Sequence, residues 1–121
     1  MAKILIVDDS PTEMHILRTA LLKSGHSVVT ATSGEEALEV ARVERPDLIL
    51  MDVIMPGMNG RELARQMMAK RQGLSVLYVS GYTENMTLRH GVLDADVNFL
   101  QKPFPLERLL RRVRETLDNR R

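Results

Sequence analysis

The sequence contains no cysteine and no tryptophan, and aromatic residues make up only 3% of its 121 residues. Without cysteine, the chain has no disulfide, no thiolate metal site and no cysteine nucleophile. No apolar run is long enough to span a bilayer, and the apolar stretch after Lys3 is too short for the core of a signal peptide. We therefore expect a soluble, cytoplasmic protein with no membrane insertion.

Charge of neither sign dominates, since the net charge is +1. Basic residues outnumber acidic ones from Lys102 onward, but they lack interleaved aromatic residues and any DNA-binding motif, so we expect no direct contact with nucleic acid.

The chain has 121 residues, of which 44% are hydrophobic, and this is enough for one domain with its own core. Because no linker or low-complexity segment interrupts it, residues 1–121 are predicted to form a single domain.

Short apolar runs alternate with amphipathic segments along the chain. The run at 48–51 has no polar alternation, which is typical of a strand covered on both faces, as in a parallel sheet. Similar runs predict further strands on either side of it. The predicted strands are Lys3–Val7, Ser27–Ala31, 48–51, Ser75–Ser80 and 98–101.

Helix-start signals fall between these strands. Ser10 with Pro11 and Glu13, and Ser33 with Glu36, are typical of helix N-termini. The predicted helices start at Pro11, Ser33 and Asn59, span 84–93 with a weaker pattern, and start again at Pro105. This alternation predicts an α/β fold, a doubly wound five-stranded parallel sheet of order 2-1-3-4-5 with helices on both faces.

Polar side chains follow the predicted strands where each one ends. Asp8 and Asp9 follow the first strand, Asp52 follows the third, Ser80 ends the fourth and Lys102 follows the fifth. The carboxyl ends of parallel strands meet at one edge of a sheet, and ligands bind there. The three carboxylates would repel one another unless a cation compensates, and a hard divalent ion such as Mg²⁺ suits oxygen ligands.

This set of residues predicts phosphoryl chemistry. A carboxylate beside Mg²⁺ and an ammonium group is placed to attack phosphorus, giving an aspartyl phosphate at Asp52. Lys102 would stabilise charge on the phosphoryl oxygens, and the Ser80 hydroxyl would donate a hydrogen bond to one of them. An ordinary strand-ending aspartate is the alternative for Asp52 taken by itself.

The same residues resemble the receiver domain of two-component response regulators. The resemblance rests on Asp8-Asp9, on Asp52 in MDVIMPGMNG, on Ser80 and on Lys102-Pro103, and it covers essentially the whole chain. The stretch AKILIVDDSPTEMHIL resembles stand-alone receivers of the chemotaxis and twitching type. The stretches SGYTEN and HGVLDADVNFLQKPFPLERLLRRVRETLD resemble receivers of hybrid sensor histidine kinases.

The resemblance implies a flavodoxin-like fold and a phosphorelay function. A histidine kinase or a histidine phosphotransfer domain would donate the phosphoryl group to Asp52, with Mg²⁺ as cofactor. Asp9, Asp52 and the backbone carbonyl of Ile54 would hold the metal directly, and Asp8 would act through water. Such a domain is not an enzyme, although it takes part in its own phosphorylation and slow dephosphorylation.

The resemblance also implies a switch. Ser80 and Phe99 match the switch positions, Lys102-Pro103 matches a peptide bond that is usually cis, and a downstream protein would read the surface from the fourth helix through the fifth strand to the last helix. Two residues depart from the family pattern. Phe99 stands where tyrosine is usual and has no hydroxyl, and Ser80 stands where threonine is usual and keeps the hydroxyl.

Two rival functions fit the residues less well. A Mg²⁺-dependent phosphohydrolase with an aspartate nucleophile generally carries a second acid two residues later, and that position is Ile54. A flavin- or nucleotide-binding module would need a glycine- or hydroxyl-rich loop after the first strand. The chain instead has Asp8 and Asp9 there, which would repel phosphate without a metal.

Overall fold

A computed structural model describes residues 2–52, 54–55, 58–70, 74–80, 99–101 and 104–119. The elements follow in the order β1 (Lys3–Val7), α1 (Pro11–Lys23), β2 (Ser27–Ala31), α2 (Gly34–Glu44), β3 (Leu48–Asp52), β4 (Ile54–Met55), β5 (Met58–Asn59), α3 (Gly60–Lys70), β6 (Ser75–Ser80), β7 (Phe99–Gln101) and α5 (Leu106–Asn119). The predicted helix at 84–93 lies outside the described residues.

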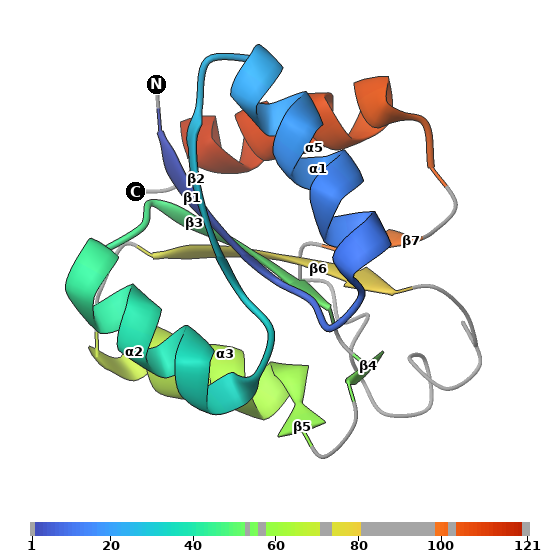
Figure 1. Ribbon diagram of the computed structural model, residues 1–121. Coiled ribbons are helices and arrows are strands. Elements are labelled where there is room, and N and C mark those ends of the chain that lie inside the picture. Colours follow the sequence, from blue (N-terminus) through green and yellow to red (C-terminus); the bar gives the residue numbers. More distant parts are fainter. Residues whose placement is uncertain are drawn as a thin grey trace.

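The main sheet is parallel throughout and has the strand order β2-β1-β3-β6-β7. This is the predicted order, since β6 and β7 are the fourth and fifth predicted strands. Figure 1 shows α1 and α5 on one face of the sheet and α2 and α3 on the other. The prediction of a doubly wound α/β sheet is therefore confirmed.

The core has two halves because side chains alternate between the faces of each strand. Leu5, Val7 and Met51 belong to the half beneath α2 and α3. Ile4 and Leu50 belong to the half beneath α1 and α5. All five are at most 1% exposed, so the central strands are covered on both faces, as the unbroken apolar runs predicted.

The serine caps form as predicted. The Ser10 Oγ accepts the backbone N–H of Glu13 at the start of α1, and the Ser33 Oγ accepts that of Glu36 at the start of α2. Gly25, with φ of 92°, lies in the left-handed region just beyond α1, where the chain turns toward β2. These local signals set where each helix begins and ends.

One feature differs from the sequence reading. The loop after β3 contains a short antiparallel pair, with Ile54 opposite Asn59 and Met55 opposite Met58. Leu106, the first residue of α5, is 42% exposed. None of the described helices combines the length and hydrophobicity that crossing a bilayer requires.

Candidate functional site

The acidic cluster is built by two neighbouring strands. Val7 of β1 lies opposite Met51 of β3, so the next residues, Asp8 and Asp52, lie side by side at the carboxyl ends of these strands. Asp9 follows Asp8 in the chain. Parallel pairing at this register therefore brings together the carboxylates that the sequence pattern predicted to meet.

The three carboxylates are close enough to share one cation. Oxygen atoms of Asp8, Asp9 and Asp52 all lie within 4.8 Å of one another. Asp8 is 1% exposed and Asp52 is 7% exposed, whereas Asp9 is exposed. Buried carboxylates at this spacing repel one another, and oxygen-only ligands are those that Mg²⁺ prefers. The donor set therefore fits a hard divalent cation, with solvent access on the side of Asp9.

Asp8 is held in place by backbone groups. Its Oδ1 accepts the backbone N–H of Ser10 at 2.9 Å, and its own N–H donates to the Ala31 carbonyl of β2 at 3.1 Å. Ser10 thus joins the cluster to the first turn of α1, which it also caps. Sequence analysis missed this contact, although aspartate side chains commonly accept the backbone N–H two residues further along the chain.

The remaining predicted site residues are placed by their strands alone. Asp52 lies opposite Val79, so Ser80 is one residue further along the neighbouring strand β6. Ser80 pairs with Gln101 of β7, and Phe99 of β7 pairs with Tyr78. Lys102 follows Gln101 in the chain and, with Pro103, lies outside the described residues. The roles of Ser80, Phe99 and Lys102 and of the Ile54 carbonyl remain predictions.

Comparison with known proteins gives a consistent match. Residues 4–114 match the response regulator receiver domain. The chain is 40% identical over 119 residues to protein PilH of Pseudomonas aeruginosa, covering 97% of this chain and 98% of PilH. It is 39% identical over 116 residues to the response regulator MprA of Mycobacterium leprae, covering 95% of this chain but only 50% of MprA.

A solved structure shows the same architecture. The chemotaxis protein CheY4 of Vibrio cholerae superposes with a TM-score of 0.84 at 33% identity, covering 96% of this chain and 98% of that one. The chain thus corresponds to nearly the whole of two relatives and to about half of a third.

Proposed function

Because this chain belongs to the family of response regulator receiver domains, we propose that it receives a phosphoryl group on Asp52 from a phosphohistidine of a histidine kinase or histidine phosphotransfer domain. The family places the chain in two-component signalling as a phosphoacceptor rather than an enzyme in its own right. The observation that supports Asp52 is its position: a buried carboxylate at the end of the central strand, beside Asp8 and Asp9.

In the proposed transfer, an Asp52 carboxylate oxygen attacks phosphorus. The new P–O bond forms as the P–N bond to the donor imidazole breaks, and the bonding electron pair passes to the imidazole nitrogen. The Ser80 hydroxyl and the Lys102 ammonium group would stabilise charge on the phosphoryl oxygens. Ile54, two residues after Asp52, offers no acid to speed hydrolysis of the product, which favours a switch over a phosphohydrolase.

The metal site would be formed by Asp9, Asp52 and the Ile54 carbonyl, with Asp8 acting through water. When bound, Mg²⁺ supplies positive charge against both the carboxylates and the incoming phosphoryl oxygens. Asp8 contributes by holding negative charge at a fixed place, since Ser10 and Ala31 fix its backbone and one of its oxygens.

The signal would leave through the edge of the sheet that β7 forms. A phosphoryl group adds about −1.5 to −2 charges and draws Ser80 and Lys102 toward it, and Phe99 on the adjacent strand β7 would turn into the space that Ser80 leaves. The partner would read the surface formed by residues 85–93, 98–101 and 105–117. Amide NMR with the phosphoryl mimic beryllofluoride tests this step, and changes that leave Phe99 unaffected would contradict it.

The proposed function is tested by intact-mass analysis after incubation with acetyl phosphate and Mg²⁺. Wild type should gain one phosphoryl group and Asp52→Asn none. Phosphorylation that persists in Asp52→Asn would place the acceptor elsewhere.

A further inference from the structure

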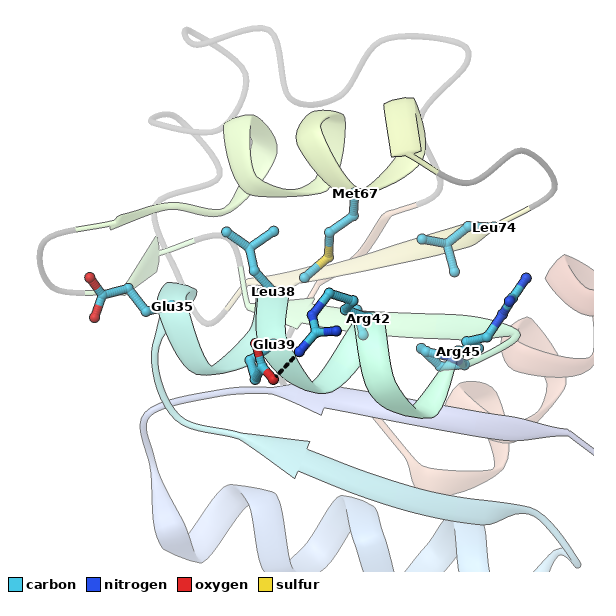
Figure 2. Close-up of a pocket in the computed structure, with 9 residues that line it drawn as sticks. Glu35, Leu38, Glu39, Arg42, Arg45, Met67 and Leu74 are labelled. Carbon is cyan, nitrogen blue, oxygen red and sulfur yellow. Dashed lines mark hydrogen bonds and ion pairs between the residues drawn. The ribbon is translucent and has the colours of Figure 1, made fainter.

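A cavity of about 450 Å³ lies between α2 and α3 (Figure 2). This volume falls within the range of small-molecule sites, roughly 300–1,000 Å³. Its lining contains none of the residues assigned to the phosphoacceptor site. The lining residues are Glu35, Leu38, Glu39, Ala41, Arg42, Arg45, Pro46, Met67 and Leu74.

Part of the cavity wall is apolar. Figure 2 shows Leu38 of α2 and Met67 of α3 pointing toward one another, with Leu74 beside them. Met67 is 3% exposed and Leu74 is 8% exposed, so little of either reaches bulk water. A methionine thioether adapts its shape to a neighbouring group. The half-buried Leu38 and Ala41 add accessible apolar surface to the wall, so a short apolar chain would find contacts there.

The two arginines at the rim differ in their partners. Arg42 donates to the Glu39 carboxylate, so its charge is already balanced (Figure 2). The Arg45 guanidinium makes no hydrogen bond or ion pair within the part of the chain that the structure describes. One cation at the rim is thus available to an anion from solution.

The backbone of Arg45 adds a second observation. Arg45 ends α2 with φ of 51° and ψ of 62°, in the left-handed region. Glycine is usual at such a position because a Cβ makes the left-handed conformation less stable, and asparagine is the common exception. Pro46, the next residue, disfavours right-handed helical backbone angles at Arg45, so α2 ends there. The helix C-terminus favours a positive charge, but its left-handed end does not favour arginine over glycine or asparagine, and the guanidinium also lines the cavity.

We propose that this cavity binds a small organic carboxylate, with its apolar chain against Leu38, next to Met67, and its carboxylate on Arg45. A planar guanidinium pairs with a carboxylate through two hydrogen bonds. Glu35 and Glu39 on the rim disfavour ligands with several negative charges, such as polyphosphates. A protein partner would need roughly 800 Å² of surface on each side, which is a poorer match to a concave site of this size.

The test is a titration of octanoate onto the full chain labelled with ¹³C at the methionine methyl groups. The Met67 signal, assigned with Met67→Leu, should shift and saturate. Octanol, which has a similar chain and no charge, should bind about tenfold more weakly, as expected from the loss of one charge-assisted pair. Equal affinity for octanoate and octanol, or a shift that does not saturate, would overturn the proposal.

Variants separate the cavity from the phosphoacceptor site. Arg45→Gln should remove the advantage of octanoate over octanol, whereas Arg18→Gln, at an exposed arginine of α1, should keep it. Asp52→Asn should bind octanoate like wild type, so failure of the proposed function would leave this result unchanged. A circular dichroism spectrum confirms that each variant is folded. An unchanged octanoate preference in Arg45→Gln would contradict the assignment of the carboxylate to Arg45, and no response of Met67 to octanoate would overturn the proposal.

Discussion

Aspartates at the two ends of the sheet lie in opposite surroundings. At the amino end, the Asp47 Oδ2 accepts the backbone N–H of Lys3 at 2.9 Å, and the Asp47 N–H donates to the Lys3 carbonyl at 2.7 Å. At the carboxyl end, oxygens of Asp8, Asp9 and Asp52 lie within 4.8 Å of one another. The first arrangement pairs a carboxylate with a donor, and the second brings like charges together.

The difference separates a structural carboxylate from functional ones. A hydrogen bond between a carboxylate and a backbone N–H stabilises the fold and ties β1 to the segment before β3. Buried like charges destabilise it unless a cation or a proton compensates. Natural sequences depart from stable local arrangements mainly at functional sites. We expect the carboxyl end of the sheet to be such a site, whereas the amino end holds the strands together.

The largest expected effect that sharpens this comparison is stabilisation by Mg²⁺. At a free concentration of 100 times the Kd, Mg²⁺ should raise the free energy of unfolding of wild type by about 2.7 kcal/mol. Asp9→Ala removes an exposed ligand and should lose most of this gain. Urea unfolding with and without Mg²⁺ measures it. Equal Mg²⁺ affinities for wild type and Asp9→Ala would require another metal site.

The next effect concerns the amino end. Asp47→Ala removes the acceptor of the Lys3 N–H and should lower the free energy of unfolding by about 2 kcal/mol, without changing the response to Mg²⁺. Glu44→Gln is the matched control, because it removes only the half-exposed ion pair with the Lys3 Nζ, a pair of a kind that contributes at most about 1 kcal/mol. The free energies of unfolding are measured in urea. Equal losses in Asp47→Ala and Glu44→Gln would show that the Asp47 hydrogen bond contributes no more than the exposed ion pair.

Much of this arrangement could be predicted from the sequence, because strong local signals specify it. Unbroken apolar runs gave the strands, and Ser10 and Ser33 marked two helix starts that the structure confirms. The pair of Ile54–Met55 with Met58–Asn59 was missed because two-residue strands have no periodicity. The cavity beside Arg45 was also missed, since it depends on how α2 and α3 pack. The predicted roles of Ser80 and Lys102 came from their chemistry and their positions at strand ends, whereas the family resemblance supplied that of Phe99.

The smallest expected effect is a pH dependence at the amino end. Burial lowers the pKa of His26 below 6.5, so the fold favours the neutral imidazole. The stability that the neutral His26 imidazole contributes is complete at pH values above the pKa of His26 in the unfolded chain. It is lost as the pH falls from there through the lower pKa of His26 in the folded chain. His26→Gln should therefore flatten the dependence of the urea midpoint between about pH 7 and about pH 5. His15→Gln, at an exposed histidine of α1, is the control and should leave the dependence as in wild type.

The central claim is that Asp52, in the acidic cluster at the carboxyl end of the sheet, accepts the phosphoryl group. It is tested most directly by locating that group in the chain. Borohydride reduces an acyl phosphate to an alcohol, so an aspartyl phosphate becomes homoserine. After incubation with acetyl phosphate and Mg²⁺ and then reduction, peptide mass spectrometry should find homoserine at position 52 and aspartate at positions 8 and 9. Homoserine at position 8 or 9 would contradict the account. So would aspartate at position 52 after reduction of a sample whose intact mass, measured before reduction, showed one phosphoryl group per chain.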